Sequence, residues 1–335
     1  MYLVPLLKVE NLQVDFKVDE GTITVVNGVN LTIDEGEVVA LVGESGSGKS
    51  MTCLSLLRLV SGPSGRISRG RILLRGEDLL LKSEREMQRI RGNDIAMIFQ
   101  EPMTSLNPVF TVGDQLCESI ILHQKVGKKE AWTRAIEMLR LVQIPLAEKR
   151  MYEYPHQLSG GMRQRVMIAM ALSCNPKILI ADEPTTALDV TIQAQIMELM
   201  KELNRRLGTA IILVSHDLGI VAEIADRVAV MYAGQVVEEA DVEDLFDSPA
   251  HPYTRGLLEC RPSLNKELER LYAIRGVVPD PSQFPSGCRF HPRCQEVRTA
   301  CQEQLPQLKE IEKGHKVRCW LATGQAAEMQ KMGGN

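Results

Sequence analysis

The chain has 335 residues, 44% of them hydrophobic and 24% charged, a composition that is ordinary for a globular protein with room for about two domains. Its 39 basic and 43 acidic residues give a formal net charge of −4, so charge gives no reason to expect nucleic acid as the main partner. No apolar run approaches the roughly 18 residues of a spanning helix, and the N-terminus lacks the basic leader and apolar stretch of a secretory signal. We therefore expect a cytosolic chain whose membrane role would come through partners.

Short strand-like segments recur along the chain, and several are nearly continuous apolar runs, as expected of strands covered on both faces of a sheet. The predicted strands are 8–16, 37–41, 71–74, 95–99, 178–181, 210–214 and 228–232. Predicted helices, including 129–141, 162–172 and 191–207, lie between them. This alternation predicts an α/β core around a largely parallel sheet. The segment 8–34, with a turn around Glu20, predicts an antiparallel hairpin alongside that core.

The character of the chain changes twice along its length. Helical patterning replaces the strand signal after Gln100, which indicates a helical subdomain of about 101–160 inserted in a first domain, 1–236. The stretch 276–292 contains four prolines, so it is expected to be extended and rich in loops. We predict that residues 237–335 form a small C-terminal extension with little hydrophobic core of its own.

A phosphate-binding pattern, GxxxxGK[ST], follows a predicted strand and precedes a predicted helix. Its residues are Gly43, Glu44, Ser45, Gly46, Ser47, Gly48, Lys49 and Ser50. Glycines let the backbone curl so that several N–H groups face one anion at the positive end of a helix. We expect Lys49 to reach the β- and γ-phosphates of a nucleotide, Ser50 to bind Mg²⁺, and Met51 to complete the nucleotide contacts. The flanking strand and helix disfavour an ordinary Gly/Ser-rich turn.

Two acids end the apolar strand 178–181. Consecutive strand residues point to opposite sides, so the carboxylates of Asp182 and Glu183 cannot share a role. We expect Asp182 to hold the Mg²⁺ shell and Glu183 to polarise the attacking water. A strand end with two solvated acids is the alternative, and the phosphate-binding pattern weighs against it.

A second glycine-bearing helix start occurs in the sequence Leu-Ser-Gly-Gly-Met. Ser159 can cap the helix that follows, and Gly160 and Gly161 leave backbone N–H groups accessible to a phosphate. One nucleotide site does not need a second such helix start. We infer that this loop contacts the γ-phosphate held by another subunit; alone, it would indicate only a Ser-capped helix.

These motifs resemble the ATP-hydrolysing (ABC) ATPase family in order and spacing, from about Leu7 to Gly234. The resemblance implies a P-loop (RecA-like) core with an antiparallel β subdomain and a helical subdomain, binding ATP and Mg²⁺. It also implies roles for four single residues: Phe16 on adenine, Gln100 on Mg²⁺ and in coupling to membrane subunits, Asp189 of Ala187-Leu188-Asp189 at the partner ATPase, and His216 sensing the γ-phosphate. For Phe16, core packing is an alternative.

A narrower resemblance points to the importer branch for dipeptides and oligopeptides. It rests on the sequences EPMTSLNP (101–108), YPHQ (154–157) and HPYT (251–254). That branch also includes nickel and glutathione importers. By itself, HPYT indicates a proline-restricted turn leading into a helix.

Four of the eight cysteines fall in one C-terminal stretch, and in a cytosolic chain clustered thiols indicate metal ligands before disulfides. They are Cys288, Cys294, Cys301 and Cys319. Zinc sites usually hold C-x2–4-C pairs, whereas this wider spacing suits a [4Fe–4S] cluster. Peptide-importer ATPases similar to this chain can carry such a cluster. Zinc, with His291 or His315 as a further ligand, and free thiols are the alternatives.

The resemblance implies a subunit that hydrolyses ATP in a head-to-tail pair with a second, different ATPase chain. It further implies two integral membrane permease subunits, an extracytoplasmic substrate-binding protein, and a peripheral location on the cytoplasmic face of the membrane. A soluble ABC ATPase acting on DNA or ribosomes is an alternative, although such proteins usually carry coiled-coil insertions or tandem cassettes. A non-catalytic metal-binding subunit is another, which the presence of Glu183 and His216 disfavours.

Overall fold

The computed structural model describes residues 4–60, 64–100, 105–186, 188–260 and 273–324. Its strands are β1 (Leu7–Val18), β2 (Gly21–Ile33), β3 (Val38–Val42), β4 (Gly65–Leu74), β5 (Glu77–Asp78), β6 (Ile95–Ile98), β7 (Ile178–Asp182), β8 (Ala210–Ser215), β9 (Arg227–Tyr232), β10 (Gln235–Asp241), β11 (Lys309–Glu312) and β12 (His315–Val317). Its helices are α1 (Lys49–Leu56), α2 (Glu84–Ile90), α4 (Val112–Gln124), α5 (Lys128–Leu141), α6 (Ala147–Arg150), α7 (Gly160–Leu172), α8 (Val190–Leu207), α9 (Leu218–Ile224), α10 (Val242–Asp247), α11 (Pro252–Glu259) and α12 (Thr299–Glu303). Single 3₁₀ turns occur at η1 (Leu79–Leu81), η2 (Pro155–Gln157), η3 (Pro281–Gln283) and η4 (His291–Arg293).

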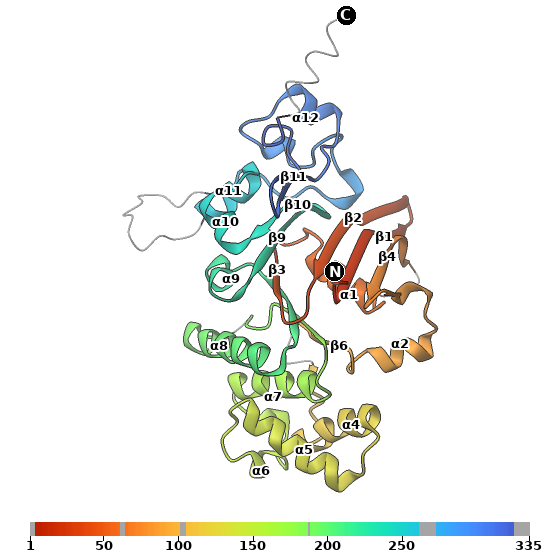
Figure 1. Cartoon of the computed structure of the whole chain (residues 1–335), viewed down its shortest axis with the longest axis vertical. Coiled ribbons are helices and arrows are strands. Elements are labelled where there is room, and N and C mark those ends of the chain that lie inside the picture. The colour runs from red at the N-terminus through yellow and green to blue at the C-terminus, as the bar shows by residue number, and fades with distance from the viewer. Residues whose placement is uncertain (1–3, 61–63, 101–104, 187, 261–272, 325–335) are drawn as a thin grey trace, which may run out of the picture. The chain divides into compact units, whose positions relative to one another are not determined.

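The chain forms two compact units, and the first comprises residues 1–32, 39–80 and 215–335. An antiparallel sheet in this unit has the order β2-β1-β4-β5, and strands β2, β1 and β4 lie side by side in Figure 1. A two-residue turn joins β1 to β2, so the predicted hairpin is present. Strand β1 pairs with β4, with Leu7 opposite Leu74 and Phe16 opposite Gly65.

A second set of strands in the first unit has the order β11-β12-β10-β9-β3. Strand β3 is wholly buried and runs parallel to β9, whereas β10 pairs antiparallel with both β9 and β12. The C-terminal extension is therefore part of a sheet. Inside it, the buried carboxylate of Glu238 accepts backbone N–H bonds from Ala250 (2.6 Å) and His251 (2.9 Å) and contacts His315 Nε2 at 2.8 Å. These bonds tie the start of α11 to β10 and β12.

The second unit comprises residues 33–38 and 81–214 and contains three parallel strands in the order β8-β7-β6. Ile95 pairs with Ile178, and Ile178 in turn with Ala210, so the three strands end at the same edge. Strand β7 has the sequence ILIAD and is buried throughout. Its apolar run ends at Asp182, which brings polar groups to the carboxyl end of the strand.

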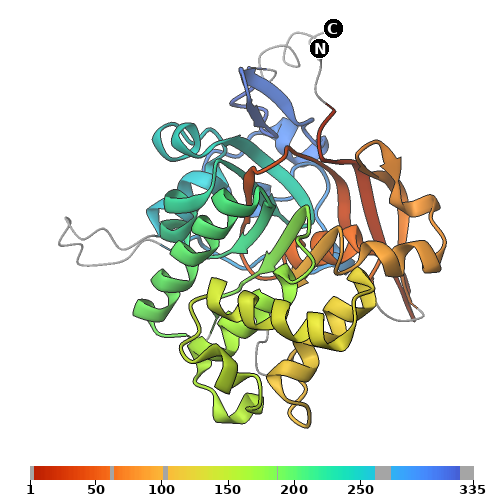
Figure 2. The same cartoon turned by 60° about the horizontal axis from the view of Figure 1, so that its bottom comes forward.

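Helices α4, α5, α6 and α7 of the second unit pack together, and this group is visible in both Figures 1 and 2. Helix α4 starts with a capping box in which Thr111 and Asp114 bond to each other's backbone N–H groups. Helix α8 is amphipathic and buries one face, which includes Ile196, Met200 and Leu203. The expected helical character after Gln100 is thus present in the described residues from 105 onward.

Strands β5, β10, β11 and β12 lie outside the predicted strands. Strand β10 has the sequence QVVEEAD, yet all of its residues except Asp241 are buried. Glu238 and Glu239 can be buried because each has a polar partner on another segment: His315 contacts Glu238, and Arg227 forms an ion pair with Glu239. A hydrophobic pattern does not reveal such pairing.

Candidate functional site

The predicted phosphate-binding loop connects β3 to α1 in the first unit. Gly43, Gly46 and Gly48 all have positive φ values, of 149°, 78° and 100°. A Cβ atom at Gly43 would lie 2.2 Å from the carbonyl oxygen of Met231, so any other residue would clash with the backbone. The glycines therefore allow the curl that turns backbone N–H groups toward one point.

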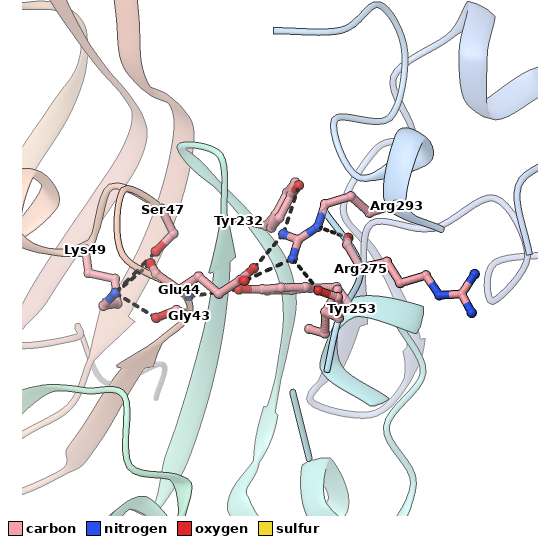
Figure 3. Close-up of polar contacts among 9 residues, drawn as sticks. Gly43, Glu44, Ser47, Lys49, Tyr232, Tyr253, Arg275 and Arg293 are labelled. Atoms are coloured by element: carbon pink, nitrogen blue, oxygen red, sulfur yellow. Dashed lines mark hydrogen bonds and ion pairs between the residues drawn. The ribbon is translucent and has the colours of Figure 1, made fainter. Parts of the chain in front are cut away.

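Lys49 is the first residue of α1, and its side chain folds back over the loop. Its Nζ donates to the carbonyl oxygens of Gly43 (2.8 Å) and Glu44 (3.0 Å) and lies 3.4 Å from Ser47 Oγ (Figure 3). The residue is only 6% exposed. Gly48 is the N-cap of α1 and supplies no side-chain cap, so the first N–H groups of the helix can serve an anion. Ser50 and Met51 lie half-buried in the first turn.

The two predicted carboxylates lie at the end of β7 in the second unit. Asp182 is 4% exposed, whereas Glu183 is half-buried and has a φ of 48°. This left-handed conformation is unfavourable for a residue with a Cβ. The strand ends at Asp182, directly before this residue.

Gln100 and Glu183 meet in the structure, at the ends of the neighbouring strands β6 and β7. Gln100 Nε2 donates to Glu183 Oε2 at 3.0 Å, and Thr186 Oγ1 donates to the same oxygen at 3.1 Å. The Glu183 carboxylate is thus oriented by two neutral donors. Thr186 was absent from the predicted site, although its position three residues after Glu183, in a turn, is a usable signal.

The Leu-Ser-Gly-Gly-Met segment starts α7 as predicted. Ser159 Oγ accepts the backbone N–H of Met162 at 3.3 Å, which makes Ser159 the N-cap, and its side chain is exposed. A Cβ atom at Gly161 would lie 2.9 Å from Ile192 Cγ2, whereas one at Gly160 would meet only Leu188 Cδ2, at 3.5 Å. Gly161 therefore permits close packing of α7 on α8, and the helix start stays accessible at Ser159.

The remaining predicted residues have simple surroundings. Phe16 is half-buried near the end of β1. His216 is exposed directly after β8. Asp189 is the N-cap of α8, where its carboxylate accepts the N–H of Ile192 at 2.9 Å. Ala187 and residues 101–104 of the predicted motifs lie outside the described residues.

The predicted site residues are divided between the two units. The phosphate-binding loop, Phe16 and His216 belong to the first unit. Gln100, Asp182, Glu183, Asp189 and the segment 159–161 belong to the second. Within each unit the geometry suits the expected chemistry: a curled loop with a lysine in one, and an oriented carboxylate in the other.

The four C-terminal thiols all lie in the first unit. Burial, with smaller contributions from the neighbouring Cys301, Cys319 and Cys294, raises the pKa of Cys288 to about 12. Burial also raises the pKa values of Cys294 and Cys319. Among the described residues, however, no three His, Cys, Asp or Glu side chains are grouped so as to hold a metal. The four thiols are therefore neighbours without forming a ready set of ligands.

A membrane-spanning helix is absent from the described part of the chain, where none of the helices is both long and apolar enough to cross a bilayer.

Comparisons with known proteins bear on both ends of the chain. The family model described as "ABC transporter" matches residues 26–186. The model described as "Oligopeptide/dipeptide transporter, C-terminal region" matches residues 237–301. The second match includes the HPYT sequence and three of the four clustered cysteines.

Similar proteins span nearly the whole chain. The oligopeptide transport ATP-binding protein AppD of Bacillus subtilis is 55% identical over 96% of this chain and 98% of its own length. OppD of the same organism is 51% identical over 97% of this chain and 91% of its own. Among solved structures, the dimeric ATP-binding cassette MJ0796 bound to ADP and Pi is 32% identical, with a TM-score of 0.63 over 70% of this chain and 98% of that one. Its fold confirms the predicted ATPase core.

Proposed function

The chain belongs to the ATP-binding proteins of ABC transporters, and we propose that it hydrolyses ATP to drive peptide import through membrane partner subunits. The ATPase proposal rests on two groups of residues, which we call half-sites. One is the curled P-loop with Lys49, and the other is the Glu183 carboxylate, which accepts hydrogen bonds from Gln100 and Thr186. The observation that favours peptide cargo is the C-terminal match to oligopeptide and dipeptide transporters. Nickel and glutathione are the alternative cargoes.

The residues present suit ATP and Mg²⁺. Ser50, Asp182 and Gln100 offer the hard oxygen donors that Mg²⁺ prefers, and the ion would neutralise phosphate charge when bound. Lys49 would bind the β- and γ-phosphates. Glu183 would accept a proton from the attacking water, held in position by its bonds to Gln100 and Thr186. We further assign Phe16 to the adenine ring and His216 to the γ-phosphate.

The nucleotide site is proposed to be composite, formed by two ATPase subunits head to tail. The exposed Ser159, together with the helix start at Gly160 and Gly161 that it caps, would complete the γ-phosphate contacts of the other subunit. Asp189 would lie at that interface. The dimeric form of MJ0796 supports a paired arrangement. The partner is proposed to be a different ATPase chain.

We propose that the chain binds two integral membrane permease subunits at the cytoplasmic face of the membrane, and that ATP hydrolysis drives transport through them. The second unit offers an open groove that suits a permease segment, lined by residues of 105–122 together with Met170. Phe110 is 51% exposed there and Leu122 68% exposed, and Asp114 and Glu118 add negative charge. An amphipathic, basic segment would fit this surface. An extracytoplasmic binding protein would deliver the cargo.

Replacing Leu122 with Glu tests this coupling surface. Transport by the assembled complex should fall, because a charge would be buried against the permease, while ATP binding by the isolated chain should not change. Leu81, which is 85% exposed and outside the groove, is the matched control as Leu81→Glu. Equal transport by both variants would remove the groove from the proposal.

The proposed metal centre is a [4Fe–4S] cluster on Cys288, Cys294, Cys301 and Cys319, with zinc as the alternative. The proposal is supported by the proximity of four buried or half-buried thiols. In the described residues, however, these thiols are not grouped closely enough to hold a metal as they stand. Four thiolate bonds would order the loops between them. Anaerobically purified protein should contain about four iron atoms per chain for one such cluster. Stoichiometric zinc without iron would identify a zinc site instead. Protein that contains neither iron nor zinc would show that the four thiols are free.

Co-purification tests the transport proposal itself. An affinity-tagged chain expressed in its own host should bring down integral membrane subunits in a stoichiometric complex, and peptide should stimulate ATP hydrolysis by that complex. Recovery with ribosomes or DNA, and with no membrane protein, would favour a soluble ABC ATPase.

A further inference from the structure

The C-terminal region contacts the P-loop at Glu44, the one acidic residue of the loop. Figure 3 shows Arg293 and Tyr253 reaching Glu44 from the side opposite Lys49. Arg293 donates through both terminal nitrogens, at 2.7 Å to Oε2 and 3.0 Å to Oε1 of Glu44. Tyr253 accepts the backbone N–H of Glu44 on its hydroxyl at 2.9 Å. The side chain and the backbone of one loop residue are therefore both fixed by the C-terminal region.

Arg293 is itself held firmly. Its side chain is 4% exposed, and its Nε donates to the carbonyl oxygen of Arg275 at 2.9 Å. Tyr232 and Phe290 lie close to its guanidinium and pack edge-on against each other. A two-pronged arginine–carboxylate contact in which the arginine is buried is more exact in geometry than a surface ion pair between two exposed side chains. The contact with Glu44 is thus built into the fold.

Tyr253 belongs to the HPYT sequence, and the neighbouring residues of that sequence fix its position at the start of α11. His251 caps α11 by accepting the Tyr253 N–H on its Nδ1 at 3.0 Å, and Pro252 occupies the first helical position. Tyr253 is fully buried against Tyr232, with ring centroids 4.6 Å apart. This motif therefore has a structural task, which is to present a hydroxyl to the P-loop.

A second arginine of the same segment acts on the loop indirectly. Arg289 donates to the carbonyl oxygen of Ala233, and its guanidinium stacks on Phe284 at 3.8 Å. The next residue, Gly234, donates its N–H to the carbonyl oxygen of Ser47 in the P-loop at 2.8 Å. Arg289 and Arg293 lie between Cys288 and Cys294, so a single short segment supports the P-loop at two points.

The negative charge of Glu44 predicts how the contact with Arg293 affects nucleotide binding. A carboxylate beside the phosphate cradle would repel an anionic nucleotide, and Arg293 cancels that charge while holding the loop in its curled form. We propose that Arg293 is a positioning residue for the P-loop, through which the C-terminal region sets the affinity for ATP. The inference rests on the proposed role of the P-loop in ATP binding. It makes the C-terminal region a control element of the nucleotide site.

Binding of a non-hydrolysable ATP analogue with Mg²⁺, measured by calorimetry on the full chain, tests the proposal. Arg293→Gln should raise the dissociation constant at least about fivefold, the lower end of typical coupling between sites. Adding Glu44→Gln should recover most of this loss, because the unpaired carboxylate is then gone. The dissociation constant of Arg293→Lys should lie between those of the wild type and Arg293→Gln. In ATPase assays KM should rise while kcat at saturating ATP stays close to wild type.

Arg255→Gln is the matched control, since Arg255 pairs with Glu296 on the same C-terminal region and, among the residues that the structure describes, forms no ion pair with the P-loop. Its analogue affinity should equal that of the wild type. If Arg293→Gln does not fold, Tyr253→Phe, which removes only the hydroxyl, should still weaken binding. An unchanged affinity in folded Arg293→Gln, or no recovery in the double variant, would overturn the proposal. A wild-type chain that fails to bind the analogue would instead overturn the P-loop assignment.

Discussion

Glu183 has a left-handed backbone and two neutral donors on one carboxylate oxygen. Such strain costs on the order of 1 kcal/mol or more and is concentrated at functional sites. A strand that simply continued would avoid it. The conformation presents the carboxylate of Glu183 to Gln100 and Thr186 and leaves Asp182 buried at the strand end. Two adjacent acids can therefore take two separate tasks.

Replacing Glu183 with Gln should nearly abolish hydrolysis. The amide keeps the size of the side chain but cannot accept the proton of the attacking water, so turnover should fall by about 100-fold or more while ATP still binds. Single-turnover hydrolysis and analogue binding measure the two effects. Glu202→Gln, on the exposed face of α8, is the control and should behave as wild type. Wild-type turnover by Glu183→Gln would remove Glu183 as the base.

Lys49→Ala is expected to act differently. Removal of the ammonium takes away a direct phosphate contact, so nucleotide affinity itself should fall. Analogue binding by calorimetry distinguishes this variant from Glu183→Gln. Similar affinities for both would contradict the separate roles proposed for the two half-sites.

His251 gives the C-terminal region a dependence on pH. Burial, helped by the charges of Arg255 and Arg318, lowers the pKa of His251 from the ordinary 6.5 to about 3. Between pH 3 and pH 6.5 the unfolded chain binds more protons at His251 than the folded chain does. The contribution of neutral His251 to the free energy of unfolding is therefore complete above about pH 6.5 and is lost as the pH falls. His251→Asn, which keeps an N-cap without titrating, should reduce the loss of unfolding free energy between pH 7 and pH 5 by about 2 kcal/mol. Urea titrations at the two pH values measure this difference, and equal losses in both proteins would refute it.

At the scale of elements, the close approach of α7 to α8 depends on one glycine of a pair. Gly161→Ala forces a Cβ against Ile192, and the clash should cost about 1–3 kcal/mol. Gly160→Ala meets only ordinary contact and should lower the melting temperature much less. Adding Ile192→Ala to Gly161→Ala should recover part of the loss. Equal melting temperatures for the two single variants would show that this packing is unimportant.

The elements that the sequence predicts are those whose local pattern agrees with their final burial. Strands β3 and β7 are apolar runs and are buried throughout, and Ser159 caps α7 as its position indicates. Strand β10 was missed because its buried glutamates look like surface residues. The ion pair of Glu44 with Arg293 joins positions 249 residues apart, and no local pattern can reveal it. The sequence predicts the half-sites, whereas long-range pairing determines what supports them.

For the whole molecule, a composite site predicts that activity depends on concentration. An isolated chain lacks the second Ser159 loop, so its ATPase rate per molecule should fall on dilution and rise when the partner ATPase is added. Ser159→Arg should abolish the gain conferred on the partner without affecting ATP binding by the chain itself. Full activity that stays constant down to a verified monomer would refute the composite site.

Peptide uptake by the purified complex in proteoliposomes tests the central claim most directly. With ATP on the side of the ATPase subunits, radiolabelled oligopeptide should accumulate at a rate proportional to ATP hydrolysis, and substitution of Glu183 with Gln should lower both rates together. Accumulation that persists without ATP hydrolysis, or hydrolysis that never moves peptide, would contradict the assignment of this chain as the motor of a peptide importer.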